Sequence, residues 1–525
     1  TDWDRNDISL YRTGVDFRQF ECGEGIVALW QGCQCVLAGR NGDLIRNMKR
    51  ICIIAGLLAC FFSITAIQAQ ENKKNDSPIR KLTLAQFAIA NLYVDETDAD
   101  KLVESAIMGM LEELDPHSTY SNAEEVKKMN EPLQGNFDGI GIQFNIAEDT
   151  LFVIQPVSGG PSEKVGIRAG DRIIMVNDTL IAGVKMTTDD ITRRLKGPKG
   201  TKVDVKVVRR GVDEPLSFTI KRDKIPVYSL DASYMITPKI GYIKINRFGA
   251  TTYEEFMDAL ASLKGQGLQD LILDLQGNGG GYLNAAIDIA NEFLGAGELI
   301  VYTEGRRNPR HEFFAKGNGK HQSGRLVVLV NEYSASASEI VAGAMQDNDR
   351  ATIIGRRSFG KGLVQQQIPF ADGSAMRLTV ARYYTPSGRC IQKPYKLGEQ
   401  EDYAQDLIDR YEHGEFFSAD SVHFADSTVY YTKQGRPVRG GGGIMPDVFV
   451  GRDTTLYTPY FNIVSNRAYT YQFAYQYTNK HRAELSKYKD WQSLEKHLLK
   501  ANWVPEFVAF AKEKGVEPNA EQLAK

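Results

Sequence analysis

Between Lys81 and Met129, apolar residues recur at the spacing of amphipathic helices. The recurring positions are Leu82, Leu84, Phe87 and Ala88, followed by Leu102, Ile107, Met110, Leu111 and Leu114. Pro116 interrupts the pattern, because proline is not tolerated in a helix interior. We therefore expect a small helical region that ends in a turn, with His117 as a packed residue of that turn.

Short runs of alternating apolar and polar residues, separated by glycines, follow between Gly135 and Asp223. The runs that predict strands are Gly139 to Phe144, Leu151 to Ile154, Arg172 to Val176 and Lys202 to Val208. Two short helices are predicted at Ser162 to Val165 and Thr188 to Leu195. This order of elements indicates a compact, β-rich module.

From Ile240 to Val450, strand and helix patterns alternate. The predicted strands are Ile240 to Ile245, Asp270 to Leu275, Leu326 to Val330 and Ala351 to Ile354. Helices are predicted near Thr252 to Lys264, Tyr282 to Phe293 and Ser338 to Gln346. Such alternation favours an α/β layered domain, whose active site lies at the carboxyl ends of its strands. The polar, aromatic-rich segment from Arg452 to Lys525 is expected to be helical.

Composition narrows the functions that this chain can have. A length of 525 residues suggests about three domains. A net charge of −3 without a long basic run argues against a nucleic-acid partner. Only Cys390 follows residue 69, and no spaced Cys/His set occurs, so we expect neither an internal disulfide nor a metal or other cofactor.

The segment from residue 48 to residue 69 has the pattern of a secretory signal peptide. Met48-Lys49-Arg50 is followed by the apolar stretch Ile51 to Ile67 and a small-residue exit at Ala69. We interpret residues 1–47 as an upstream mis-start, and we expect export to the periplasm or cell envelope. The alternatives are a membrane anchor formed by the apolar stretch, and lipidation at Cys60.

A glycine-rich loop, Asp274 to Gly281, follows one predicted strand and precedes a helix. Backbone N–H groups at such a place stabilise developing negative charge, as an oxyanion hole requires. A tight structural turn is the alternative. The loop lacks the spacing of a phosphate-binding loop.

Three serines, Ser334, Ser336 and Ser338, lie where another strand gives way to a helix. One of them could cap the helix while another acts as a nucleophile, and their spacing does not choose between them. Lys361, which lies between two glycines, could be the base if burial lowers its pKa well below ~10.4. A solvated surface lysine is the alternative.

Together these segments resemble the carboxyl-terminal processing proteases, or tail-specific proteases, a family of Ser/Lys peptidases. The similar stretches run from about Leu82 to Val450. They include Leu114 to Ser118, Asp274 to Gly281, Ser334 to Glu339, Gly360 to Gly362 with Gln365, Asp372 to Ser374, Tyr384 to Arg389 and Gly443 to Asp447. Within them, Gly139 to Gly141, Pro161 to Ile173 and Val176-Asn177 resemble a PDZ domain of the bacterial, circularly permuted kind.

The resemblance implies a role for each candidate residue. The family's nucleophile precedes its lysine by 25 residues, which selects Ser336 for Lys361. Gln365, four residues beyond the lysine, would orient it. The N–H groups of Gly281 and Ala337 would form the oxyanion hole.

In the PDZ domain, Gly139, Ile140 and Gly141 would hold the terminal carboxylate of a peptide that adds as a strand. Two positions depart from the family pattern. Lys196 and Gln276 each stand where arginine is usual. Lysine keeps the charge but lacks the planar, two-pronged donor, so gating of the active site by the PDZ domain is less firmly implied than proteolysis.

The expected architecture is multidomain α+β. It comprises a helical N-terminal region (70–130), a small β-rich PDZ domain (131–225), an α/β layered, ClpP/crotonase-like protease domain (226–450) and a helical C-terminal extension (451–525). The expected function is that of an exported serine endopeptidase that cuts proteins near free apolar C-termini. Its expected partners are those substrates and a lipoprotein or adaptor, and it is expected to be a monomer or dimer. The rival hypotheses are an inactive PDZ adaptor and a carrier of small apolar ligands.

Overall fold

The computed structural model describes residues 77–147, 149–424, 426–455 and 457–524. The expectations for the mis-start segment, the signal peptide and Cys60 fall outside the described residues. The chain divides into two compact units, residues 1–103 and 104–525, and each is described by itself.

The described part of the first unit is helical. Helix α3, Pro78–Leu92, begins after Ser77, whose side chain accepts a hydrogen bond from the Arg80 N–H at 3.3 Å. Its apolar side chains are exposed, with Leu84 and Phe87 each 64% accessible. Helix α4, Ala99–Glu112, begins in this unit and ends in the second. The predicted helical spacing is thus present without a buried face on α3.

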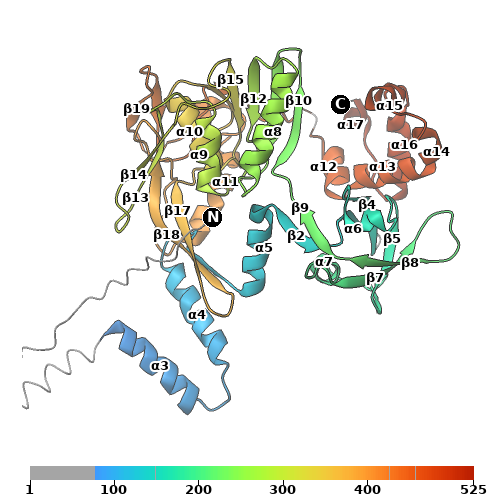
Figure 1. The fold of residues 1–525 in the computed structure, drawn as a ribbon, viewed down its shortest axis with the longest axis horizontal. Coiled ribbons are helices and arrows are strands. Elements are labelled where there is room, and N and C mark those ends of the chain that lie inside the picture. Colours follow the sequence, from blue (N-terminus) through green and yellow to red (C-terminus); the bar gives the residue numbers. More distant parts are fainter. Residues whose placement is uncertain (1–76, 148, 425, 456, 525) are drawn as a thin grey trace, which may run out of the picture. The chain divides into compact units, whose positions relative to one another are not determined.

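The region that we expected to be a PDZ domain is a sheet with two short helices (Figure 1). Its strands are β3 (Ile142–Ala147), β4 (Thr150–Pro156), β5 (Arg172–Val176), β6 (Thr179–Leu180), β7 (Lys202–Val208) and β8 (Leu216–Lys221). Its helices are α6 (Pro161–Lys164) and α7 (Thr188–Leu195), and β2 (Asn136–Gly139) pairs with β9 (Asp223–Pro226) beside it. Alternate residues of β7 are buried, namely Val203, Val205 and Val207, as the period of two requires.

The single strand predicted from Gly139 to Phe144 is wrong. Strand β2 ends at Gly139 and β3 begins at Ile142. The chain turns between them because Gly141 has a φ of 71°, and a Cβ there would lie 2.8 Å from the Ile225 side chain. Apolar alternation continues through this turn, so periodicity alone does not reveal it.

The α/β region contains a six-stranded sheet in the order β10-β11-β12-β15-β16-β21. These strands are Leu230–Met235, Ile240–Ile245, Asp270–Asp274, Leu326–Val330, Thr352–Gly355 and Val448–Phe449. All neighbours from β11 onward are parallel. Helices α8 (Thr252–Gly265), α9 (Leu283–Asn291) and α10 (Ala337–Asp347) accompany this sheet, and every residue of α10 is buried. Along strands β11 and β15 buried and half-buried residues alternate, so one face of the sheet is more deeply buried than the other.

A second sheet joins strands from distant parts of the chain. It contains β1 (Thr119–Ser121), β13 (Leu299–Glu304), β14 (His311–Phe314), β17 (Leu363–Pro369) and β18 (Ala375–Tyr384). Strands β17 and β18 form a hairpin in which Gln365 faces Thr379. Around the sheets lie α5 (Ala123–Gln134), α11 (Gln400–Glu412), the 3-10 turn η1 (Ala419–Ser421), β19 (Val429–Tyr431) and β20 (Pro437–Arg439).

The C-terminal region is helical, as expected. Its helices are α12 (Pro459–Asn466), α13 (Tyr469–Lys480), α14 (Arg482–Leu485), α15 (Trp491–Leu498), α16 (Trp503–Glu513) and α17 (Ala520–Ala524). Val464, Tyr469, Phe510, Ala511 and Val516 form its small core. Across the described residues of the whole chain, the helices are too short or too polar to span a membrane.

Candidate active site

The serine segment and the glycine-rich loop lie at the same edge of the six-stranded sheet. They follow the neighbouring parallel strands β15 and β12. The Ser334 hydroxyl donates to the Leu275 carbonyl oxygen and the Ser338 hydroxyl to that of Asn278, each at 2.8 Å, and both serines are fully buried. These two hydroxyls therefore hold the segments together, and Ser336 is the half-buried serine that lines a cavity.

Ser336 has an unusual backbone, with φ 56° and ψ −113°. This region is unfavourable for residues other than glycine, and such strain persists only where surrounding contacts hold it. The Ser336 N–H donates to the Glu339 carboxylate at 2.8 Å. Helix α10 begins at the next residue, Ala337, so the serine lies at the positive end of a buried helix.

Glu339 connects the serine segment to the lysine segment. Its carboxylate accepts hydrogen bonds from the N–H groups of Ser336, Gly360 and Lys361 and from the Ser358 hydroxyl. Its side chain is completely buried, and this desolvation raises the pKa of the carboxyl. We did not assign this function from the sequence. The sequence feature that could have indicated it is the position of Glu339 as the one acidic residue in the first turn of the helix, where a carboxylate can bind back to the N-cap backbone.

The Tyr383 hydroxyl forms a second link between the same segments. It donates to the carbonyl oxygens of Lys361, at 2.6 Å, and Ser336, at 3.1 Å. The Tyr383 side chain is 1% exposed, and burial raises its pKa well above the ordinary value. It therefore remains a neutral donor at any physiological pH.

Lys361 and Gln365 contact one another directly. The Lys361 ammonium nitrogen Nζ donates to Gln365 Oε1 at 2.9 Å. Burial, together with the nearby charge of Arg377, lowers the pKa of Lys361 to about 8. A substantial fraction of Lys361 is thus neutral just above neutral pH. Within the described residues, the one hydrogen bond that Nζ forms runs to Gln365 rather than to the Ser336 hydroxyl.

His117 supports Gln365 through its backbone. The Gln365 amide nitrogen Nε2 donates to the His117 carbonyl oxygen, which leaves Oε1 directed at Lys361. The imidazole Nε2 lies 2.9 Å from the Tyr403 hydroxyl, and burial lowers the pKa of His117 to about 4. The expected packed turn residue therefore also positions the glutamine, a role that its sequence neighbours did not indicate.

The turn that contains His117 is fastened to strand β18. The buried Asp115 carboxylate accepts from the Ser118 hydroxyl at 2.5 Å and from the Thr379 hydroxyl at 2.9 Å. The Thr379 N–H in turn donates to the Ser118 oxygen at 3.1 Å. Because Thr379 faces Gln365 across the hairpin, the turn and the glutamine share one rigid support.

The expected oxyanion donors, Gly281 and Ala337, lie close to Ser336. A Cβ on neighbouring Gly280 would come 2.7 Å from the Ser336 Cβ. Gly281 has a φ of 145° and forms an isolated bridge with Phe248, whose carbonyl oxygen a Cβ would strike. No acceptor for the N–H of Gly281 or Ala337 occurs in the described part of the chain, so both donors are available to a bound oxyanion.

All five residues expected in the protease site line one cavity of about 640 Å³. They are Gly281, Ser336, Ala337, Lys361 and Gln365. Helix α5 contributes Met129, Asn130, Pro132 and Leu133 to the same wall. The cavity therefore unites a hydroxyl, an amine of lowered pKa and two free N–H donors, which together can perform acyl transfer.

The other expected site residues lie in the turn between β2 and β3. The Ile140 carbonyl oxygen accepts from the Ser162 N–H and hydroxyl, and that of Gly141 accepts from the Val157 N–H at 2.9 Å. The N–H groups of Ile140 and Gly141 have no acceptor among the described residues. Strand β3 is the end strand of its sheet, so a peptide strand could pair with it.

Lys196 reaches from the end of α7 to helix α5. Its Nζ donates to Glu131 Oε2 at 2.5 Å and lies 4.5 Å from the centre of the Phe137 ring. Gln276, the second departure, uses its N–H to bind the Asp274 carboxylate at 2.8 Å. The structure offers no account of a glutamine at that position.

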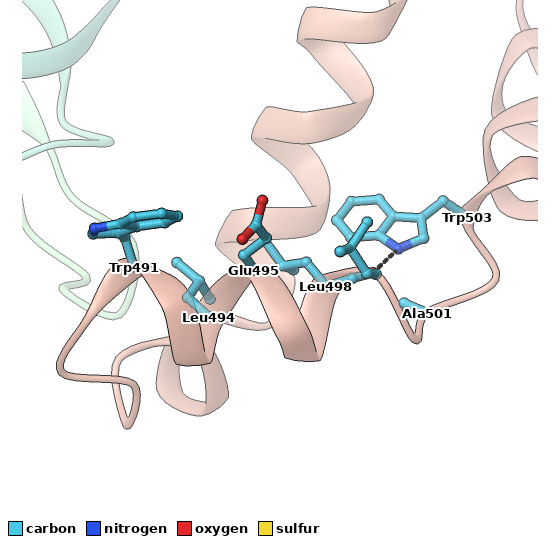
Figure 2. A pocket seen from close by; sticks show the side chains of 7 residues that line it. Trp491, Leu494, Glu495, Leu498, Ala501 and Trp503 are labelled. Atoms are coloured by element: carbon cyan, nitrogen blue, oxygen red, sulfur yellow. Dashed lines mark hydrogen bonds between the residues drawn. The ribbon is translucent and has the colours of Figure 1, made fainter. Parts of the chain in front are cut away.

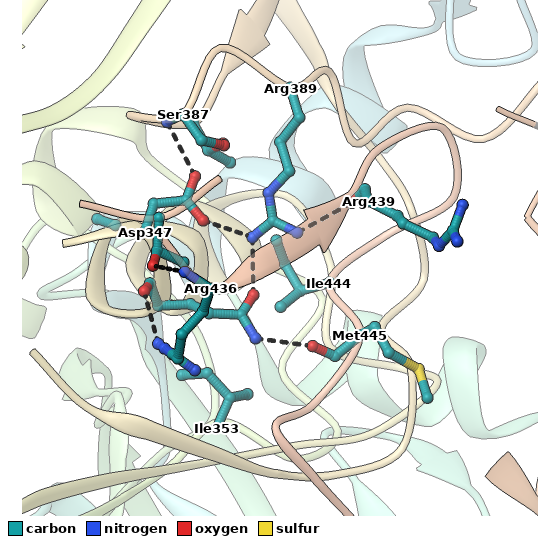
Figure 3. Close-up of polar contacts among 12 residues, drawn as sticks. Asp347, Ile353, Ser387, Arg389, Arg436, Arg439, Ile444 and Met445 are labelled. Carbon is teal, nitrogen blue, oxygen red and sulfur yellow. Dashed lines mark hydrogen bonds and ion pairs between the residues drawn. The ribbon is translucent and has the colours of Figure 1, made fainter. Parts of the chain in front are cut away.

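The far end of helix α10 is fixed by a buried ion pair (Figure 3). The Arg389 guanidinium donates to the Asp347 carboxylate and to Gln346 Oε1, each at 2.7 Å, and to the Arg439 carbonyl oxygen at 2.9 Å. Arg389 and Asp347 are both fully buried. This contact gives the motif Tyr384 to Arg389 a structural task, which is to support the helix that begins beside Ser336.

A second cavity, of about 470 Å³, lies in the C-terminal region (Figure 2). Its walls come from Trp491, Leu494, Glu495, Leu498, Leu499, Ala501 and Trp503. Glu495 is the one titratable residue in that wall. This apolar cavity contains none of the residues predicted for catalysis.

Family models match most of the described chain. The model of Peptidase family S41 matches residues 239–404, a PDZ domain model matches residues 152–209, and the model of the activating protease CtpB N-terminal domain matches residues 62–125. Residues 460–525 match a family of unknown function. The β-rich module is thus a PDZ domain and the α/β region an S41 protease domain.

Two curated relatives are similar over most of their length. The carboxy-terminal-processing protease of Bartonella bacilliformis is 39% identical over 355 residues, which cover 66% of this chain and 80% of that protein. The carboxy-terminal processing protease CtpA of Bacillus subtilis is 37% identical over 360 residues, which cover 67% and 76%. Among solved structures, a photosystem II D1 C-terminal processing protease is 26% identical, with a TM-score of 0.36, over 70% of this chain and 92% of that one.

Proposed function

The chain belongs to the family of carboxy-terminal processing proteases, serine proteases with a PDZ domain, and from that premise we propose that it is an exported endopeptidase that uses a Ser336/Lys361 dyad. The observation that carries this proposal is the meeting of Ser336, Lys361, Gln365 and two free N–H donors in one cavity.

The proposed reaction proceeds through an acyl-enzyme. The Ser336 hydroxyl oxygen attacks the scissile carbonyl carbon, and neutral Lys361 accepts the hydroxyl proton. The N–H groups of Gly281 and Ala337 stabilise the oxyanion. Lys361 then gives the proton to the leaving amine, and the amide bond breaks. Water, deprotonated by Lys361, finally hydrolyses the ester and restores Ser336.

Gln365 sets the position of Lys361 in this scheme. Its Oε1 accepts a hydrogen bond from Nζ, while its Nε2 is fixed by the His117 carbonyl oxygen. Lys361, Gln365 and Ser336 line the same cavity, so the proposed proton transfer requires Nζ to turn from Gln365 toward the Ser336 hydroxyl within that cavity.

Recognition of apolar C-terminal tails is proposed for the PDZ domain. The free N–H groups of Ile140 and Gly141 suit a terminal carboxylate, and β3 offers an unpaired edge to the preceding residues. The apolar residues Ile142, Phe144 and Ile146 of β3 pack only partly into the domain core. They favour an apolar tail over a charged one.

Export rests on the signal-like segment from residue 48 to residue 69. Cell fractionation of the full chain tests it: we expect the mature protein in the periplasm or envelope. A membrane-bound product that retains the segment would indicate the anchor instead, and recovery in the cytoplasm would contradict export.

The dyad is tested with a protein substrate that carries a free apolar tail. Ser336→Ala and Lys361→Ala should each abolish cleavage, whereas Ser233→Ala, an exposed serine on β10, should cleave like wild type. Cleavage by either dyad variant would contradict the mechanism. Tail binding without turnover by the wild type would support the adaptor hypothesis instead.

A further inference from the structure

The active-site cavity has a one-sided charge. Three of its lining side chains are cationic, namely Arg247, Lys361 and Arg377, and no Asp or Glu is present among the described lining residues. Lys361 must be neutral to act as a base, so the two arginines supply the lasting positive charge. The carboxylates of Asp115 and Glu339 also act on Lys361 from behind the cavity wall, but the charged side chains that line the wall itself are cationic.

The two arginines differ in how their side chains are used. Arg247 Nε donates to Asn246 Oδ1 at 2.8 Å. For the half-buried Arg377, the described residues provide neither a hydrogen-bond acceptor nor an ion-pair partner. A guanidinium that is partly removed from water has a strong requirement for an acceptor, so Arg377 is the one available to bind a ligand.

Strand pairing fixes Arg377 beside the catalytic groups. It lies on β18 between Thr119 of β1 and Gln367 of β17, so its backbone is held on both sides. Directly opposite residues of an antiparallel pair share a face, and so do residues two apart on one strand. Gln365, Gln367 and Arg377 accordingly line the same cavity.

The charge of Arg377 also acts on the base. It is one of the causes that lower the pKa of Lys361, after burial. An arginine at this position keeps more of the lysine neutral. Both observations give Arg377 a role in the reaction rather than in the packing of the hairpin.

We propose that Arg377 is a specificity residue that pairs with a carboxylate on the polypeptide segment in the active-site cavity. The carboxylate is either the side chain of an Asp or Glu near the scissile bond or the α-carboxylate of a short tail. This inference rests on the proposed proteolysis. It assigns the cavity a preference of its own, separate from the apolar preference of the PDZ domain.

Internally quenched peptides test the inference. Pairs carry Glu or Gln at successive positions on both sides of the cut, with identical C-terminal residues so that the PDZ contribution is constant. For at least one position, wild type should cleave the Glu peptide about tenfold better in kcat/KM, the size expected for a charge-assisted contact. Arg377→Gln should lose this preference and Arg377→Lys should keep part of it. Arg382→Gln, an exposed arginine on the same strand, should retain it.

A second arm separates the two sources of the carboxylate. Each peptide is also made with an amidated C-terminus. If amidation lowers kcat/KM for wild type but not for Arg377→Gln, Arg377 binds the α-carboxylate. If amidation lowers kcat/KM equally in both, the α-carboxylate is bound by the PDZ domain. Labelling of Ser336 by a fluorophosphonate confirms that each variant is folded around its active site.

The outcomes distinguish the two proposals. Two results overturn the role of Arg377 and leave proteolysis intact. In the first, wild type cleaves the peptides with no Glu preference and with no amidation effect that depends on Arg377. In the second, the preference is unchanged in Arg377→Gln. If no peptide is cleaved, proteolysis fails. The same pairs are then titrated against Ser336→Ala and its Arg377→Gln double variant, where a Glu preference that depends on Arg377 still supports the binding site and its absence overturns it.

Discussion

Two residues of the candidate active site are held in states that are energetically unfavourable for their residue types. Ser336 has a φ of 56°, and Lys361 is a buried amine whose pKa falls to about 8. Each costs folding free energy that the surrounding contacts must offset. Substitutions that remove the cost should therefore stabilise the fold while they destroy the activity.

The backbone of Ser336 leads to the first prediction. Glycine adopts its φ and ψ without strain, whereas alanine keeps the strain that serine has. We expect Ser336→Gly to unfold at a higher urea concentration than Ser336→Ala, by about 1 kcal/mol in the free energy of unfolding. Both variants should be inactive. Equal stability of the two would show that the backbone relaxes.

The lowered pKa of Lys361 sets the pH dependence of cleavage. In the proposed mechanism the neutral amine is the reactive form, so kcat/KM should rise with pH through an apparent pKa of about 8 and level off above it. A stopped pH–rate series with one uncharged peptide measures this limb. A flat profile between pH 6.5 and 9 would argue against Lys361 as the base.

The same shift affects stability. In the unfolded chain the pKa returns to about 10.5, so the folded state binds the proton less tightly and carries a full penalty below pH 8 that vanishes above about pH 10.5. Lys361→Met should gain about 2 kcal/mol at pH 7, after loss of the contact to Gln365 is allowed for. Denaturant unfolding at pH 7 and pH 10 should show the gain shrinking with pH.

At the scale of elements, helix α10 directly follows Ser336, the proposed nucleophile, and ends at Asp347, the ion-pair partner of Arg389 (Figure 3). Every residue of the helix is buried, so core packing holds it along its length and polar contacts fix its two ends. The contacts of Glu339 with Ser336, Gly360 and Lys361 fix the N-terminal end of the helix, and Arg389 fixes its C-terminal end.

Removal of Arg389 should be costly. Arg389→Met leaves the Asp347 carboxylate buried without its partner, and we expect a loss of about 3–5 kcal/mol in the free energy of unfolding. Arg325→Met is the matched control, since Arg325 pairs with Asp270 on the surface with its side chain 84% exposed. It should lose less than about 1 kcal/mol. Similar losses in urea titrations of both variants would contradict this account.

Elements with a strong local pattern could be predicted from the sequence. Helix α7 and strands β5, β7, β11 and β15 begin and end where the periodicity indicated. The failure at Gly139 to Phe144 arose because the chain turns at Gly141, where a positive φ and the close approach of Ile225, a residue distant in the chain, both favour glycine. Local pattern contains no information about such a contact.

In the candidate site, too, some residues could be predicted from the sequence and others could not. The resemblance to a family selected Ser336, Lys361 and Gln365, and the structure brings them into one cavity. The residues that hold them, Glu339 and Tyr383, act through contacts between segments that are separate in sequence. A single sequence indicates reactive residues by their type, but it does not show which buried carboxylate or hydroxyl orients them.

At the scale of the whole molecule, the PDZ domain and the cavity are connected through helix α5. Lys196 at the end of α7 binds Glu131, and neighbouring residues of α5, including Pro132 and Leu133, line the cavity. A tail bound beside α7 could therefore alter the wall of the active site. The Lys196 ammonium forms one hydrogen bond with the Glu131 carboxylate, whereas an arginine guanidinium would form two.

Breaking this contact should affect tailed substrates selectively. We expect Lys196→Met and Glu131→Gln each to lower kcat/KM for a protein with an apolar tail severalfold, with little change for a small ester that lacks a tail. Lys196→Arg should restore the tailed activity. If the ester reaction falls equally in both variants, the contact supports the fold of the site rather than its coupling to the PDZ domain.

The shared carboxylate of Glu339 has a consequence for how the enzyme tolerates motion. Since the backbones of Ser336 and Lys361, the proposed nucleophile and base, both donate to the Glu339 carboxylate, a displacement of that carboxylate should move both residues together and change the distance between them little. Thermal motion at the start of helix α10 should therefore displace Ser336 and Lys361 in the same direction. Their relative alignment is protected even where their absolute position is not.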